Sequence, residues 1–176
     1  MVQSALAIFF IAASVLVRLM PHVPNVAPVI GIGLYSGAYL PKRWAFVVPL
    51  SVIIVGDMAL GWIPEHLFGW IAVGISVAIG LLLKNRTSVL AVAGAAFASS
   101  TLFFLLSNFG VWFFAYAHDS YSRDVSGLLS CYSAGIPFYR NGLTGDLLYT
   151  AVLFGSTEIL VRWFSGRTAA VSTASK

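Results

Sequence analysis

The sequence predicts an all-α fold, an integral membrane protein built as a bundle of six helices. The first observation behind this prediction is composition, because 59% of the 176 residues are hydrophobic and only 9% are charged. Soluble domains carry about 25% charged residues. With a mean hydropathy of +0.91, the chain has too few polar side chains to cover a water-facing surface. Most of its surface is therefore expected to face lipid.

The second observation is a series of apolar segments, most of them near the length of about 20 residues that a membrane-spanning helix needs. The segments are Met1–Met20, Val29–Leu40, Trp44–Trp62, Leu67–Leu83, Thr87–Leu106 and Leu143–Phe164. Proline, glycine and charged residues separate them. Residues 1–164 are therefore expected to form a single transmembrane domain with a long outer loop between the fifth and sixth helices. A polar, disordered tail is expected at residues 165–176.

The third observation is the distribution of charge between the links, which alternate between the two sides of the membrane if six helices cross it. One side then receives basic residues without acidic ones: Lys42, Arg43, Lys84, Arg86, Arg167 and Lys176. The other side receives three arginines together with Glu65, Asp119 and Asp124. The positive-inside rule then places both termini in the cytoplasm, in a multi-pass protein of the inner (cytoplasmic) membrane. The N-terminal apolar run lacks the basic start and the clear cleavage site of a signal peptide, so we expect it to stay as a helix.

Small residues four positions apart predict faces where helices pack closely. They are Gly33 and Gly37 on the second segment, and Ala91, Ala95 and Ser99 on the fifth. Glu158 and Arg162 have the same spacing near the inner end of the last segment. This pair is expected to form an ion pair on one helix face.

Polar side chains from distant parts of the chain are expected at one depth, just below the outer surface. Ionisable residues inside membrane spans are costly, so each is a candidate functional residue. The candidates are Arg18, Asn25, Asp57, Asn108, Arg140, Asn141 and Asp146, with aromatic walls from Trp112, Tyr116, Tyr132, Phe138 and Tyr139. Together they predict a pocket for a small-molecule substrate under the long loop, mostly apolar with a few convergent polar groups. The alternative is that the charged residues pair with one another and tie the helices together.

Other motifs exclude several classes of function. The single cysteine, Cys131, rules out an internal disulfide. It is expected to be a buried small residue, with a soft metal ligand or a nucleophile as alternatives. The three histidines lack the spacing of a metal site, so no metal or cofactor is predicted. The sequence contains no phosphate-binding loop and no basic run, so neither ATP hydrolysis by that route nor nucleic-acid binding is expected.

The predicted small-molecule binding protein would not be an enzyme. Two other classes of function stay open beside it. One is an intramembrane enzyme that uses Cys131 or His118 with Asp146, if a nucleophile and a base lie within hydrogen-bond reach. The other is a non-catalytic accessory protein that only packs against other membrane subunits.

Part of the chain resembles a known family of transport proteins. The matching features are Pro24-Asn-Val-Ala-Pro28, a short glycine-rich segment, Gly37-Ala-Tyr-Leu-Pro-Lys-Arg43, and an apolar span reaching Gly56-Asp57. They resemble the first half of S components, the substrate-binding membrane subunits of energy-coupling factor (ECF) vitamin transporters. The resemblance implies capture of a vitamin or cofactor-like solute from the outer face, and release driven by a transmembrane coupling subunit and ATPases.

One feature of the first segment departs from that family. S components often dock their partner through alanines four apart, and Ala5, Ala7, Ala12 and Ala13 do not have this spacing. The segments Cys131–Asn141 and Gly145–Tyr149 also resemble an uncharacterised bacterial family of small polytopic membrane proteins.

Overall fold

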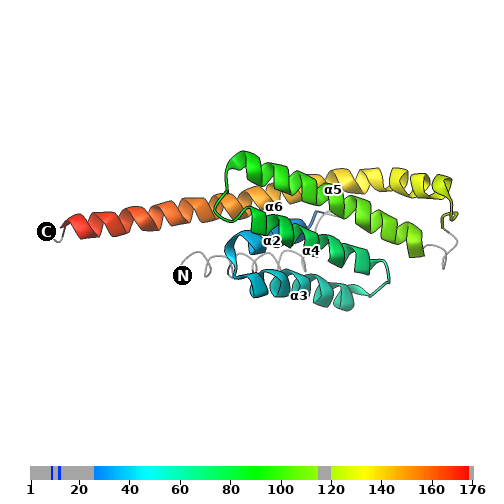
Figure 1. The fold of residues 1–176 in the computed structure, drawn as a ribbon, viewed down its shortest axis with the longest axis horizontal. Helices are drawn as coiled ribbons and strands as arrows, with labels where there is room; N and C mark the ends of the chain where they lie inside the picture. Colours follow the sequence, from blue (N-terminus) through cyan, green and yellow to red (C-terminus); the bar gives the residue numbers. More distant parts are fainter. Residues whose placement is uncertain (1–8, 10–11, 13–25, 115–119, 175–176) are drawn as a thin grey trace.

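The computed structural model describes Phe9, Ala12 and residues 26–114 and 120–174, with side chains through Trp163. The described residues form α2 (Val29–Tyr39), α3 (Lys42–Leu60), α4 (His66–Leu82), α5 (Val89–Phe114) and α6 (Val125–Ala174) (Figure 1). No strand occurs among them, which confirms the all-α class. The expected first span lies outside the described residues except for Phe9 and Ala12, so the structure does not show a six-helix bundle.

The bounds of α2, α3 and α4 agree closely with the expected segments because strong local signals mark them. Pro28 and Pro41 stand just before α2 and α3, and their carbonyl oxygens accept hydrogen bonds from Ile32 and Ala45. Proline suits the start of a helix because it has no backbone N–H to satisfy there. Gly61 follows α3 with a φ of 113°, a conformation that stops the helix and favours glycine.

The prediction of a long outer loop between the fifth and sixth helices is wrong. Helix α5 continues past Leu106 to Phe114, and α6 begins at Val125 rather than Leu143. Glycine, serine and asparagine were interpreted as loop residues in this stretch, but packing between α5 and α6 outweighs their weak local preferences. Between these two helices the structure describes residues 120–124, which are not helical.

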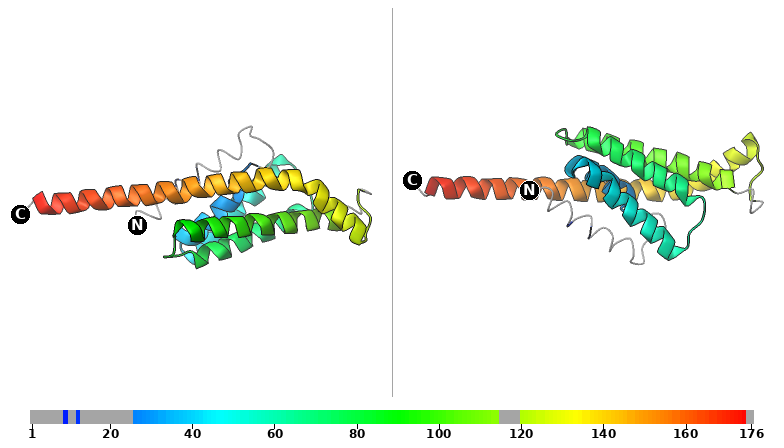
Figure 2. Two further views of the ribbon diagram at one scale, coloured as in Figure 1. Left: turned by 90° about the horizontal axis from the view of Figure 1, so that it is seen from above. Right: turned by 60° about the horizontal axis from the view of Figure 1, so that its bottom comes forward.

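Helix α6 contains Pro137 in its interior and bends in its N-terminal part (Figure 2). Proline removes one hydrogen bond of the helix and its ring crowds the preceding turn, which bends rather than ends a well-packed helix. The bend carries the start of α6 along α5. At its other end the α6 backbone extends away from the bundle to Ala174 (Figure 1), through residues expected to form a disordered tail. Alanines in this segment favour helix.

The core is organised around α2, which contacts α3, α4, α5 and α6. Every residue of α2 from Ile30 to Ala38 is buried. A Cβ atom on Gly37 would collide with the backbone of Val77 and Gly80 on α4, so the two helix backbones lie in direct contact there. This confirms the packing face that Gly33 and Gly37 predict.

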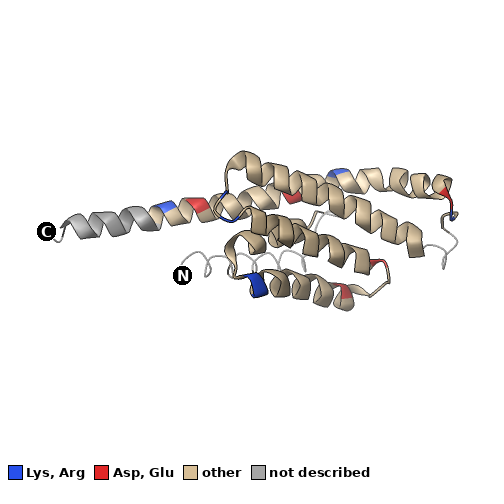
Figure 3. Ribbon diagram, in the orientation of Figure 1, with Lys and Arg blue, Asp and Glu red and all other residues tan. Residues whose placement is uncertain are grey.

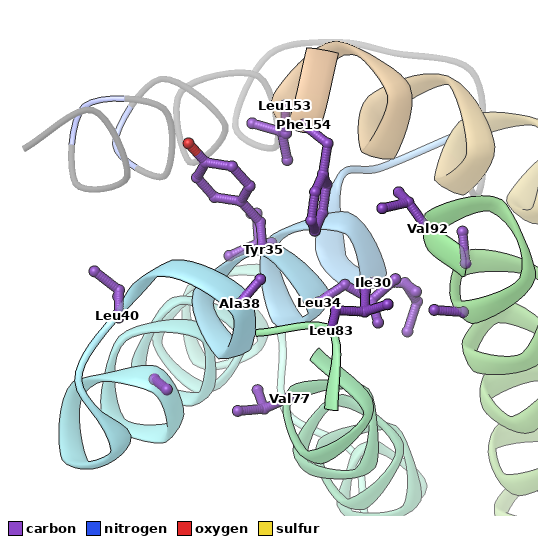
Figure 4. Close-up of a cluster of buried hydrophobic side chains, with 14 residues drawn as sticks. Ile30, Leu34, Tyr35, Ala38, Leu40, Val77, Leu83, Val92, Leu153 and Phe154 are labelled. Carbon is purple, nitrogen blue, oxygen red and sulfur yellow. The ribbon is translucent and has the colours of Figure 1, made fainter. Parts of the chain in front are cut away.

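The other side of α2 packs against α6. Tyr35 lies against Phe154 (Figure 4), with ring centroids 5.4 Å apart. The Tyr35 hydroxyl hydrogen-bonds with the Thr157 hydroxyl. The predicted ion pair further along α6 is confirmed, because Arg162 Nε lies 2.8 Å from Glu158 Oε1.

The surface of the described helices is largely apolar. Helices α3 and α5 are long and apolar enough to cross a membrane, and α2 and α4 are shorter apolar helices. In the most apolar windows of α3 and α5 only 28% and 22% of residues are buried inside the molecule. Large side chains such as Val55, Ile71 and Phe97 are more than half exposed.

Charged residues concentrate at the two ends of the bundle (Figure 3). Lys42 and Arg43 begin α3, and Lys84 lies in the link from α4 to α5 at the same end. Glu65 and Asp124 precede α4 and α6 at the opposite end. Among the described residues, one end is therefore basic, and the other carries Glu65 and Asp124 together with Arg123, which is the distribution that the sequence predicts for the inner and outer sides.

Candidate small-molecule cavity

A cavity of about 490 Å³ lies between the start of α2, the C-terminal half of α5 and the bent part of α6. Its volume falls within the range of about 300–1,000 Å³ that is typical of small-molecule sites. The lining residues are Ala27, Val29, Ile30, Ser100, Phe103, Phe104, Ser107, Asn108, Val111, Phe138, Tyr139, Gly142 and Asp146. The wall is mostly apolar, with a few hydroxyl, amide and carboxyl groups.

Three of the polar or aromatic residues predicted for the site, Asn108, Tyr139 and Asp146, line this cavity together. Phe138, predicted as part of the aromatic wall, lines it as well. On α6, Tyr139, Gly142 and Asp146 are spaced three and four residues apart, so they share one helix face. The bend at Pro137 brings this face against α5.

Asp146 supplies the carboxylate of the cavity. Its residue surface is only 6% exposed, and it accepts a hydrogen bond from the Ser100 hydroxyl of α5. Gly145, next to Asp146, lets the chain before α2 pack closely, because a Cβ on Gly145 would stand 3.0 Å from a methyl carbon of Val26. Close packing of the chain before α2 therefore holds this turn of α6 in place.

Tyr139 and Phe104 form the aromatic side of the cavity. Their ring centroids lie 4.7 Å apart, and the Tyr139 hydroxyl is 2.8 Å from the Thr101 hydroxyl. Tyr132 adds a second ring beside Phe104 at 5.7 Å and donates its hydroxyl proton to the Leu105 carbonyl oxygen at 2.9 Å. Tyr132 thus supports the wall from behind, since it does not line the cavity.

Asn108 is held by both helices. Its side-chain nitrogen donates to the Phe104 carbonyl oxygen at 2.9 Å, one turn back on α5. Its Oδ1 atom stands so close to Gly135 that a Cβ on Gly135 would overlap it. Cys131 Sγ donates to the Asn108 carbonyl oxygen at 3.4 Å. The first two contacts hold the side-chain amide in place, and the third connects the Asn108 backbone to α6.

Other residues predicted for the site lie elsewhere. Arg140 and Asn141 are exposed and do not line the cavity, because they fall off the helix face shared by Tyr139 and Asp146. Trp112 donates from Nε1 to the Ser122 carbonyl oxygen at 3.0 Å, so it ties the end of α5 to the link before α6.

Asp57 belongs to a separate cluster at the end of α3. It is 7% exposed and accepts a hydrogen bond from Trp70 Nε1 at 2.8 Å. His66 Nδ1 lies 3.9 Å from the same carboxylate. The structure thus connects Asp57 to α4, and Asp57 does not line the cavity. Arg18, Asn25, Tyr116 and His118 lie outside the described residues.

Sequence reasoning missed the α5 side of the cavity. Ser100, Phe104, Ser107 and Val111 recur every three or four residues, which is the spacing of one helix face. This signal is visible once the fifth helix is continued beyond Leu106. Ending the helix there separated Asn108 from the residues that share its face.

Cys131 is buried, with 2% exposure, and does not line the cavity. Its thiol is directed at a backbone carbonyl oxygen rather than at a base. Within the part of the chain that the structure describes, no three His, Cys, Asp or Glu residues gather as a metal site would require. The arrangement can enclose a small molecule and offer it a carboxylate, hydroxyls, an amide and aromatic rings.

Comparison with known proteins gives one match. A protein-family model described as a family of unknown function (DUF6580) matches residues 1–170. No curated protein and no solved structure matches the chain.

Proposed function

We propose that the chain, which belongs to the DUF6580 family because the family model matches nearly all of it, is a membrane-embedded subunit that binds a small solute. The observation that carries this proposal is the cavity of about 490 Å³ between α2, α5 and α6. An accessory protein that only packs against partners needs no such space. A few polar groups in a mostly apolar wall are typical of sites that bind small molecules.

Membrane insertion is supported by the exposed apolar side chains on α3 to α6 and by the spans available in α3 and α5. We propose six spans with both termini on the cytoplasmic side of the inner membrane, because the basic end of the bundle then faces the cytoplasm. The C-terminal half of α5 and the link to α6 then lie toward the outer side. The cavity is placed to receive a solute from outside.

Solute uptake is the process that this binding step would serve. The resemblance to ECF S components suggests a coupling subunit and ATPases as partners, since the sequence has no phosphate-binding loop of its own. The solute would bind in the cavity and be released inward when those partners change the protein's state.

The test is to block the cavity without changing the fold. Ser107 lines the cavity, whereas Ser133 is an exposed residue of α6 outside it. The protein and its Ser107→Trp and Ser133→Trp variants are purified from the membrane and analysed by native mass spectrometry. We expect a bound small molecule on the unchanged protein and on Ser133→Trp, and its loss from Ser107→Trp because the indole fills the space.

The proposal fails if the unchanged protein carries no small molecule. It also fails if Ser107→Trp retains the bound molecule as fully as Ser133→Trp does. Size-exclusion chromatography of both variants checks that they stay folded.

A further inference from the structure

We infer that the solute is a protonated organic amine with a flat apolar body, whose ammonium group binds the Asp146 carboxylate. This inference rests on the proposed function and adds to it the chemical class of the ligand. It follows from the charges of the cavity and from the rings that surround them.

The described lining of the cavity carries an acidic residue and no basic one. Among the described residues that line it, Asp146 is acidic and none is Lys, Arg or His. In that part of the chain the partner of its carboxylate is the neutral hydroxyl of Ser100. A carboxylate that is only 6% exposed is costly when it lacks a positive partner in an apolar setting. A cationic ligand supplies that partner and stabilises the ionised carboxylate, whereas an anionic ligand meets no positive group among these residues.

The aromatic wall suits the same ligand. Phe103, Phe104, Phe138 and Tyr139 line the cavity, and the Phe104 and Tyr139 rings are 4.7 Å apart. Aromatic faces attract organic cations, and they stack against flat apolar groups. An amine with an aromatic or other planar body therefore uses both kinds of surface at once.

The far end of the cavity offers neutral hydrogen-bonding groups. Asn108 and Ser107 lie two turns from Ser100 along α5, roughly 12 Å at about 1.5 Å per residue. A ligand that spans this length places its ammonium beside Asp146 and Ser100. A neutral polar group at its other end then meets Asn108.

Three indole compounds test the inference, because they share one body and differ in charge. Tryptamine is a cation, tryptophol is neutral and indole-3-acetate is an anion. Binding is measured by isothermal titration calorimetry on the protein in nanodiscs of phosphatidylcholine, a lipid without net charge. We expect tryptamine to bind at least about tenfold more tightly than tryptophol, which is the scale of one charge-assisted hydrogen bond. Indole-3-acetate is expected to bind most weakly.

Variants test whether the preference for tryptamine over tryptophol depends on the Asp146 carboxylate. Asp146→Asn should bind tryptamine and tryptophol alike, because the amide keeps the shape and loses the charge. Asp146→Glu should keep the preference for tryptamine. Glu158→Gln is the matched control, since it removes the same charge from α6 roughly 18 Å away at about 1.5 Å per residue. It should bind like the unchanged protein.

Equal binding of tryptamine and tryptophol by the unchanged protein would overturn the inference, and so would a preference that persists in Asp146→Asn. Failure of all three probes to bind counts against it as well. The proposed function is judged separately by the native mass spectrometry. If the bound molecule lost from Ser107→Trp is neutral or anionic, the result would support the proposed solute-binding function and overturn the inference that the solute is an amine.

Discussion

Asn108 and Gly135 show how single residues shape the cavity. The glycine lets α6 approach α5 so closely that the Asn108 side chain lies where a Cβ would be. The side-chain amide of Asn108 donates to the Phe104 carbonyl oxygen at 2.9 Å, and the backbone carbonyl oxygen of Asn108 accepts from Cys131 Sγ at 3.4 Å. Asn108, Cys131 and Gly135 were predicted to lie in a loop, and they instead form part of the contact between α5 and α6.

Gly135→Ala should destabilise the protein by about 1–3 kcal/mol, the usual cost of overpacking. Alanine favours helix by about 1 kcal/mol over glycine, but the collision with Asn108 outweighs that gain. Gly155→Ala on the same helix is the control, because its added Cβ meets nothing within 4 Å. It should leave stability unchanged or raise it. Thermal unfolding in nanodiscs compares the two, and a shift in the same direction for both variants would contradict the packing argument.

At the scale of elements, the accuracy of the sequence prediction follows the local signals. Prolines and charged links mark the ends of α2, α3 and α4, so these ends were predictable. The interface of α5 and α6 gave no such signal, because its serines, glycines and Pro137 are common in loops and are tolerated here by packing. Asn108, Tyr139 and Asp146 were predictable as polar or aromatic groups of an apolar chain. Their meeting in one cavity was not, because residues 107–142 were assigned to a loop.

The start of α6 depends on Asp124. Its Oδ1 accepts hydrogen bonds from the Gly127 N–H at 2.7 Å and the Ser122 hydroxyl at 2.8 Å. These bonds favour the ionised form and hold the pKa of Asp124 below its usual value. A depressed folded pKa means that the stabilisation is present above the unfolded pKa and is lost as pH falls through the folded one.

Hydrogen exchange at the Gly127 and Leu128 amides tests this cap. In the unchanged protein, protection corrected for the intrinsic rate should fall as pH is lowered from about 6 to about 2, because free aspartate titrates at about 3.9 and the Asp124 pKa lies below that value. Asp124→Ala should show low protection at every pH. Constant protection in the unchanged protein across this range would remove Asp124 from the role of cap.

At the scale of the whole molecule, one feature supports the proposed membrane insertion and another supports the proposed orientation. The apolar side chains exposed on α3 to α6 are explained by lipid. The proposed orientation places the end with Lys42, Arg43 and Lys84 on the inner side, and the end with Glu65, Arg123 and Asp124 on the outer side (Figure 3). The candidate cavity lies along the C-terminal half of α5, toward the proposed outer side.

Cysteine labelling tests that orientation. Cys131 is the single cysteine, so a Cys131→Ala background allows one new cysteine at a time. A maleimide that cannot cross membranes should label Ser120→Cys, in the link before α6, in intact cells. Thr87→Cys, in the link before α5, should be labelled only after permeabilisation. Labelling of both from the same side would contradict the arrangement of the spans.

The most direct measurement is an experimental structure of the protein purified from its own membrane without added ligand. The account predicts density for a small molecule between Asp146 and Asn108, with a polar atom within hydrogen-bond distance of the Asp146 carboxylate. An empty cavity, or one in which a side chain of the protein itself pairs with Asp146 and fills the space, would contradict it.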